Sequence, residues 1–166
     1  MPRWFWTQFN EASGVYTIGE VMNGDMGFLS SYVGPLDAVL NYPFFYTVRD
    51  TIFESKDMFN LREYYNRWGQ NIEQQKLEVL GNFIDNHDNK RILSVGGNWE
   101  DKKKHFKTAN ALVLTSIGIP IVYYGTEQYY AGGDDPNNRE ILWRNMDPNS
   151  EMYRYIATIN EARKRA

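Results

Sequence analysis

Carboxylate side chains follow closely after two short apolar runs of this 166-residue sequence. Glu20 comes after "VYTI", and Asp85 and Asp88 come after "VLGNFI". Two carboxylates that face one substrate can divide acid and base, or acid and nucleophile, roles, because a shared apolar cleft and mutual repulsion separate their pKa values. Glu20 and Asp88 are therefore candidate catalytic partners. An ordinary strand-end carboxylate paired with a lysine is an equally open interpretation of Glu20.

The other polar residues do not indicate a metal site. His87 adjoins Asp88, but a single histidine in a strand-end turn is more often a hydrogen-bonding residue than a catalyst. Two histidines and no cysteine do not favour zinc. The loop "AGGDDPNNRE", with Asp135 and Arg139, lacks EF-hand spacing, so an ordinary turn is favoured over calcium. An arginine placed there to meet a sugar hydroxyl or a carboxylate is the functional alternative.

Composition limits the class of protein. An apolar content of 42% over 166 residues is enough for one domain with a buried core. The formal net charge of -3 gives no reason to expect a nucleic acid or a membrane surface as partner. Without cysteine, a disulfide framework and a cysteine nucleophile are excluded. The first twenty residues lack the zones of a signal peptide, and no apolar run reaches membrane-spanning length.

Hydrophobic patterns predict the elements that position these side chains. Expected helices cover Pro2 to Gly14, Tyr42 onward, 61–72, 106–114 and 152–159, and expected buried strands cover 15–18, 38–40, 79–84 and 118–124. Strands that are short and continuously apolar favour an α/β fold with a parallel sheet covered on both faces. Catalytic groups gather at the carboxyl ends of such strands. The irregular segment 124–149 is longer than a usual connection between elements, and we expect it to have a functional role for that reason.

Four stretches occur in a characteristic order: "GVYTIGEVMNGD", "AVLNYPFFY", "FIDNHDNKR" and "GIPIVYYGTEQYYAGGDDPNNRE". In order and approximate spacing they resemble the alpha-amylase family of glycoside hydrolases, and they are most similar to its fungal type. The resemblance runs from about Phe5 to the last expected helix. It implies an α/β fold that is the second half, strands 5 to 8, of a (β/α)8 TIM barrel, with residues 1–166 as a partial catalytic barrel.

The resemblance also implies roles for single residues. Glu20 matches the family's general acid/base, on the fifth strand. Asp88 matches the aspartate after the seventh strand that fixes substrate hydroxyls and stabilises the transition state. His87 matches the neighbouring histidine that contacts the sugar. Asp85 departs from the glutamate that is common at its motif position, which leaves the match of Asp88 unchanged.

Four further residues match the two ends of the family's cleft. Asp135 and Arg139 match the pair in the loop after the eighth strand that bounds the glycone side. Met22 and Gly24 match positions that line the leaving-group side. A substrate-binding role for these four residues is thus implied by the resemblance.

The resemblance places several family features outside this sequence. The catalytic nucleophile would be an aspartate at the end of the fourth strand, and strands 1 to 4, the calcium-binding inserted subdomain and the C-terminal β-sandwich would also be missing. Ca²⁺ is expected for an intact family member, with most ligands not in this chain. We expect the chain alone to be inactive. Unpaired first and last strands favour self-association of the half-barrel.

The expected function is retaining hydrolysis of internal α-1,4-glucosidic bonds of starch or glycogen. An α-glucan would be the partner, and the location would be extracellular if the chain follows the family. One alternative is a sister specificity on the same barrel, such as an α-glucosidase or transglycosylase, because substrate choice depends on loops not present here. Another is a non-catalytic glucan-binding or interaction protein.

Overall fold

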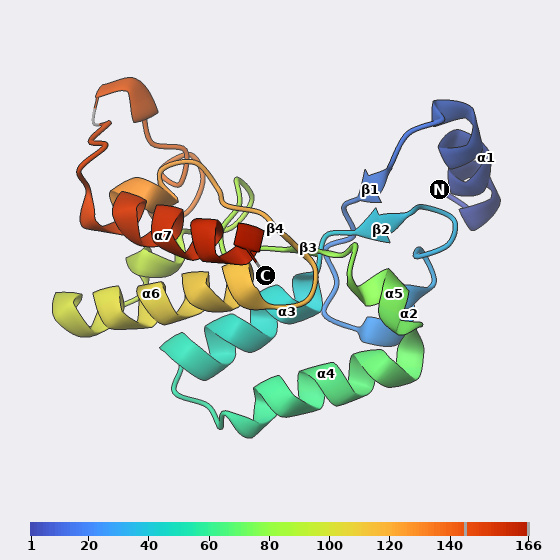
Figure 1. The fold of residues 1–166 in the computed structure, drawn as a ribbon, viewed down its shortest axis with the longest axis horizontal. Helices are drawn as coiled ribbons and strands as arrows, with labels where there is room; N and C mark the ends of the chain where they lie inside the picture. The colour runs from blue at the N-terminus through green and yellow to red at the C-terminus, as the bar shows by residue number, and fades with distance from the viewer. Residues whose placement is uncertain (145, 166) are drawn as a thin grey trace.

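The computed structural model of the chain describes residues 1–144 and 146–165. Its strands are β1 Ile18–Gly19, β2 Ala38–Val39, β3 Gly81–Asn82 and β4 Ile119–Pro120. β1 pairs with β2 and β3 pairs with β4, in both cases in parallel. A parallel bridge between Leu40 and Gly81 joins the two pairs. The spatial order of the strands is therefore their sequence order, as in consecutive βα units (Figure 1).

One helix precedes β1, helical segments follow β4, and the others connect the strands, as parallel pairing requires. The helical segments are α1 Arg3–Ser13, α2 Met26–Ser30, α3 Tyr42–Val48, the π-helical turn Arg49–Phe53, α4 Phe59–Asn71, α5 Gln74–Leu77, α6 Trp99–Thr115 and α7 Glu151–Arg165, with short 3₁₀ turns at Ile92–Ser94, Thr126–Gln128 and Leu142–Arg144. Figure 1 shows α6 and α7 side by side, at the opposite end of the molecule from α1. Among the described residues, no helix is long and apolar enough to cross a membrane.

The core lies where the predicted helical stripes meet the strands. The structure buries apolar side chains of α4, α6 and α7 together with residues beside β3, among them Leu61, Trp68, Phe106, Val113, Met152 and Leu80. A second, smaller cluster consists of Tyr42, Phe45 and Phe83. The helix stripes were predictable because a period of 3.6 residues places such side chains on one face.

α1 agrees with its prediction in extent but contributes no fully buried side chain. Pro2 precedes its first residue, and Gly14 ends it in the left-handed conformation with φ of 64°. Trp4 and Phe9 are 63% and 49% exposed. The apolar face of α1 is thus only partly covered within the described chain.

The predicted strand positions need correction. The run 15–18 was expected to be a buried strand, but pairing begins only at Ile18, and Val15 is 70% exposed. The runs 38–40, 79–84 and 118–124 are likewise paired over two residues each, apart from the bridge at Leu40. An apolar run specifies burial, whereas the length of a ladder depends on which backbone lies beside it. β1 and β4 each pair on one side only within the described residues.

Gly81 lets side chains of neighbouring strands lie close to β3. A Cβ atom at this position would lie 2.8 Å from Ile18 Cδ1 and 2.7 Å from Ile121 Cδ1. Side chains from β1 and from the residue after β4 therefore meet over β3.

Candidate active site

The candidate site lies just past the carboxyl ends of the strands. Glu20 directly follows β1, and His87 and Asp88 lie in the loop after β3. The loop 131–140 comes after β4. Because the strands are parallel, these segments leave the sheet at the same edge.

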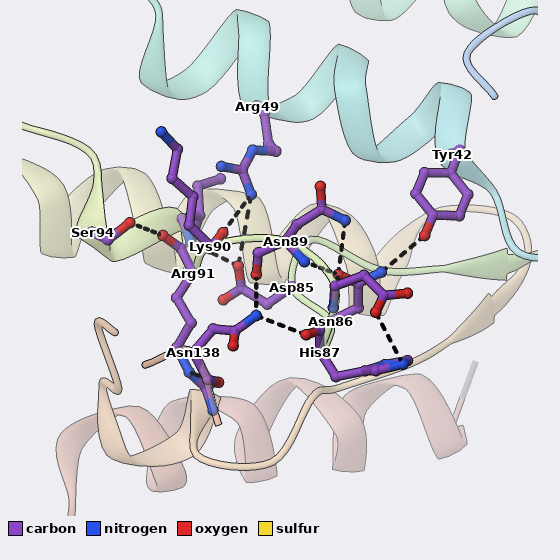
Figure 2. Close-up of polar contacts among 12 residues, drawn as sticks. Tyr42, Arg49, Asp85, Asn86, His87, Asn89, Lys90, Arg91, Ser94 and Asn138 are labelled. Carbon is purple, nitrogen blue, oxygen red and sulfur yellow. Dashed lines mark hydrogen bonds and ion pairs between the residues drawn. The ribbon is translucent and has the colours of Figure 1, made fainter. Parts of the chain in front are cut away.

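Two side chains link Glu20 to the loop after β3. The Tyr42 hydroxyl donates to Glu20 Oε1 at 2.8 Å and accepts from Asn86 Nδ2 at 2.9 Å. Tyr42 is the first residue of α3, and Figure 2 shows its ring reaching from that helix toward Asn86. Burial, and then the hydrogen bond to Glu20, raise the Tyr42 pKa well above its usual range. The phenol thus stays protonated and keeps its donor directed at the carboxylate.

Asn86 extends this link to Asp88. Its side-chain oxygen accepts from the backbone N–H groups of Asp88 at 3.2 Å and of Asn89 at 2.9 Å. Glu20 and the backbone of Asp88 are therefore connected through Tyr42 and Asn86. Motif matching named Glu20 and Asp88 but not the two linking residues. The available signal was their place inside the quoted motifs, "AVLNYPFFY" and "FIDNHDNKR".

Asp88 and its neighbours form an exposed charged cluster with the loop 131–140. His87 Nε2 lies 3.3 Å from Asp88 Oδ1, and Arg139 Nη2 lies 4.0 Å from the same oxygen. Arg139 Nε contacts Asp135 Oδ1 at 2.9 Å and donates to the His87 carbonyl at 3.3 Å. The structure thus brings together four of the residues that the sequence singled out. Their exposure leaves hydrogen-bonding capacity for a ligand.

Met22 and Gly24 lie on the Glu20 side, in the loop after β1. Met22 is 54% exposed. A Cβ at Gly24 would lie 3.1 Å from the Tyr46 ring, so this loop packs closely on α3. Beside Glu20, a cavity of about 420 Å³ is lined mainly by apolar side chains, including Trp6, Phe9, Ile18, Tyr32 and Leu36.

Asp85 lies beneath the exposed cluster and is buried. Its Oδ1 accepts from the Ile92 N–H at 2.7 Å and lies 4.0 Å from Arg49 Nη1. Burial raises the Asp85 pKa to about 7, against the opposing effects of the Ile92 N–H, Arg49 and Arg91. Figure 2 shows Arg49 reaching Asp85 from the helix that also carries Tyr42. Asp85 therefore supports the loop from within and does not face the site.

The described residues offer no metal site made of three or more His, Asp or Glu side chains. In the loop 131–140, the Asp135 carboxylate contacts Arg139. Glu140 contacts Arg91 and accepts from the Gly132 N–H. Protein donors thus engage the Asp135 and Glu140 carboxylates of this loop.

Comparison with known proteins places this chain in a family. The model of the alpha-amylase catalytic domain matches residues 2–166. The chain belongs to the alpha-amylase family.

Curated and solved alpha-amylases agree with this assignment. Alpha-amylase 1 of Lipomyces kononenkoae is 38% identical over 98% of this chain, which spans 25% of that relative. An alpha-amylase from Malbranchea cinnamomea superposes with a TM-score of 0.91 at 34% identity, over 99% of this chain and 34% of that protein. The fold is therefore that of part of an alpha-amylase catalytic domain, and the chain spans a quarter to a third of these two relatives.

The same fold also occurs with another specificity. A cyclomaltodextrin glucanotransferase superposes with a TM-score of 0.84 at 26% identity, over 99% of this chain and 35% of that protein. Membership of the family thus leaves the choice among its reactions open.

Proposed function

We propose that this chain forms strands 5 to 8 of an alpha-amylase barrel and supplies two of its catalytic carboxylates, Glu20 and Asp88. The reaction is retaining hydrolysis of internal α-1,4-glucosidic bonds in starch or glycogen. The observation that carries the proposal is the link from Glu20 through Tyr42 and Asn86 to Asp88. That link joins the Glu20 carboxylate to the backbone of Asp88 at one edge of a parallel sheet.

Glu20 acts as the general acid and base. Its carboxyl group gives a proton to the glycosidic oxygen as the bond from that oxygen to C1 breaks. In the second step the Glu20 carboxylate takes a proton from the water that attacks C1. The Tyr42 hydroxyl fixes the Glu20 side chain in both steps because it donates to Oε1.

Asp88 and the residues around it bind the sugar being cleaved. The Asp88 carboxylate accepts from sugar hydroxyls and stabilises positive charge on the ring in the transition state. His87 and Arg139 donate to hydroxyls of the same sugar, and Asp135 orients Arg139. Met22 and Gly24 line the opposite, leaving-group side.

The nucleophile belongs to a part of the barrel outside this chain. A retaining mechanism requires a carboxylate about 5 Å from the acid/base. We assign it to the end of the fourth strand. Calcium, if the intact protein binds it, would take most of its ligands from residues outside this chain.

A transferase or other sister specificity is the second candidate. The structural likeness to a cyclomaltodextrin glucanotransferase favours it. Glu20 and Asp88 have the same roles in both reactions. The two reactions differ in the acceptor, which is water in hydrolysis and a sugar hydroxyl in transfer.

A chimeric protein tests the proposal. The 166 residues replace the matching third of the Malbranchea cinnamomea alpha-amylase, and starch and maltoheptaose are the substrates. We expect internal cleavage with products released as the α-anomer. The chain alone should release no reducing sugar above background, because loss of a covalent nucleophile costs many orders of magnitude in rate. A folded chimera that is inactive on both glucans, or an active isolated chain, contradicts the proposal.

Substitutions in the chimera test the roles. Glu20→Gln and Asp88→Asn should each lower kcat/KM by roughly a thousandfold or more, since each removes a group that acts in the transition state. Asp85→Glu, the matched carboxylate control, should keep turnover within about tenfold because it can still accept from Ile92. Near-normal turnover by Glu20→Gln or Asp88→Asn would contradict the catalytic role of that residue. An inactive Asp85→Glu variant would show that Asp85 is also required for turnover. Transfer to an added acceptor in place of hydrolysis would select the second candidate.

A further inference from the structure

Arg91 is a fully buried arginine that the mechanism above does not use. Its guanidinium carbon lies 4.4 Å from the centre of the Tyr123 ring, 5.2 Å from that of Tyr124 and 5.4 Å from that of Tyr130. These rings belong to the segment that follows β4, whereas Arg91 belongs to the loop after β3. A buried charge is tolerated only where it is paired, so its partners define what this arginine does.

The groups that accept hydrogen bonds from the Arg91 side chain and from its backbone N–H lie in the loop 131–140. Arg91 Nε contacts Glu140 Oε2 at 2.5 Å and donates to the Asn138 carbonyl at 3.1 Å. The Arg91 backbone N–H donates to the Gly132 carbonyl at 3.1 Å, and the Gly132 N–H donates to Glu140 Oε1 at 2.6 Å. Arg91, Gly132 and Glu140 therefore form a closed ring of contacts between the two loops.

The joined loops carry the exposed charged cluster of the site. Asp88 lies three residues before Arg91, and Arg139 lies one residue before Glu140. Asn138 Nδ2 strengthens the junction because it donates to the carbonyls of His87 at 2.8 Å and Asn89 at 2.9 Å. Figure 2 shows the Arg91 side chain extending from the loop after β3 toward Asn138, which lies below this loop in the view. A change in the buried pair would thus move Asp88 relative to Arg139.

We propose that Arg91 and Glu140 are positioning residues that set the placement of Asp88 against Arg139 without touching substrate. This inference rests on the proposed function. It states that the buried Arg91–Glu140 pair determines the geometry of the residues that we propose to bind the sugar. Arginine suits this role better than lysine, because its planar guanidinium donates along fixed directions while its faces lie on aromatic rings.

The path of the loop 131–140 depends on the same contacts. A Cβ at Gly132 would lie 1.8 Å from the Asn137 carbonyl oxygen, so the loop folds back closely on itself. The Gly132 N–H and carbonyl then meet Glu140 and Arg91. In this conformation of the loop, the contacts of the pair and the close approach at Gly132 are satisfied together.

A purely structural arginine elsewhere in the chain provides the control. Arg163 Nη1 donates to the Leu114 carbonyl at 2.9 Å, and its Nη2 donates to the Gly118 carbonyl at 2.7 Å. These bonds tie α7 to the segment before β4 and reach no residue of the candidate site. Arg163→Lys should thus perturb packing while leaving the two loops in place.

Hydrogen exchange in the folded chimera tests the positioning directly. Arg91→Lys and Glu140→Gln should speed amide exchange in 86–90 and 131–140 by about tenfold or more, since both loops lose their junction. Glu140→Gln retains a side chain that can accept from the Gly132 N–H. It therefore provides a second test of the junction if Arg91→Lys fails to fold. Arg163→Lys should change exchange near 114–118 and leave the two loops as in the parent chimera. Equal exchange in the loops of all three variants overturns the inference.

Kinetics in the chimera test the consequence for catalysis. Arg91→Lys and Glu140→Gln should lower kcat/KM by about tenfold or more, with part of the loss in kcat, because Asp88 acts in the transition state. The kcat/KM of Arg163→Lys should stay within about twofold of the parent value, even if its melting temperature falls as much as that of Arg91→Lys. An active parent chimera whose Arg91 and Arg163 variants behave alike overturns the inference and leaves the proposed function intact. An inactive parent overturns the proposed function, whereas the exchange measurement still decides the junction.

Discussion

The two sides of the candidate site differ in how they are supported. On the side of β3 and β4, the loops that carry Asp88 and Arg139 are joined by the buried Arg91–Glu140 pair and by Asn138. On the side of β1, Glu20 is exposed and accepts from Tyr42. α1, next to it, has no fully buried residue.

This difference shows which side of the site is held in place by contacts within the chain and which side has few such contacts. Hydrogen bonds and ion pairs inside the chain hold the side of Asp88 and Arg139 in place, so the geometry of that side is preorganised. The Glu20 side faces a cavity of about 420 Å³ lined by Trp6, Phe9 and other apolar residues. We expect this side to depend on the part of the barrel that our proposal places outside the chain.

The largest effect should appear in the assembly of the isolated chain. β1 and β4 pair on one side only among the described residues, and Ile18 and Ile119 are 40% and 39% exposed. Exposed apolar edges recruit other chains, so we expect a dimer or larger species and a poorly cooperative melt. Size-exclusion chromatography with light scattering, followed by a thermal melt, measures this. A monomer that melts cooperatively would show a self-sufficient domain and end the half-barrel interpretation.

The next effect concerns Asp85 on the supported side. Burial raises its folded-state pKa to about 7, above the ordinary carboxyl value of 3.8, so the folded state retains a proton that the unfolded state has released. The resulting stability is present below about pH 4 and is lost as pH rises through 7, by up to about 4 kcal/mol in total.

Urea unfolding of the chimera between pH 4 and pH 8 measures this loss. The amide side chain of the Asp85→Asn variant cannot titrate. This variant should therefore lack the part of the pH dependence of the unfolding free energy that Asp85 contributes. Asp135→Asn is the matched control, because it changes an exposed carboxylate of the same site. A parent and an Asp85→Asn variant with identical pH profiles would show that Asp85 stays ionised beside Arg49 throughout.

The smallest effect should come from Tyr42, whose side chain links the two sides. Tyr42→Phe removes the donor to Glu20 and the acceptor for Asn86, at a cost of about 1 to 2 kcal/mol of stability. We expect kcat of the chimera to fall by about tenfold, because Glu20 loses its orientation. Tyr64→Phe is the matched control, since the buried Tyr64 hydroxyl contacts Asn41 and not Glu20. Equal kinetics of the two variants would contradict a role for Tyr42 in placing Glu20.

Local periodicity explains which parts of the fold were predictable. The stripe of Phe106 and Val113 specified α6 because burial on one helix face needs no distant partner to be recognised. The ends of the strands were not predictable, because Val15 is apolar yet has no neighbouring backbone to pair with in the described chain. Pairing is a property of two segments, and sequence patterns describe one.

The same reasoning applies to the site. Glu20 and Asp88 were named from motif positions, and their placement at the sheet edge follows from where the strands end. Their catalytic roles stay predictions. Arg91 and Glu140 were not named, because they are 49 residues apart and each alone resembles a solvated charge. A buried ion pair can be recognised only when both partners and the surrounding rings are seen together.

One helix has a consequence for how this region can vary in evolution. Tyr42 begins α3, and Arg49 follows it by seven residues, so both side chains point from one face toward the loop after β3 (Figure 2). One inserted or deleted residue between them would rotate Arg49 by about 100° away from Asp85 while Tyr42 kept its contact with Glu20. Length variation among natural relatives should therefore be tolerated in the connection 54–58 and selected against within 42–49.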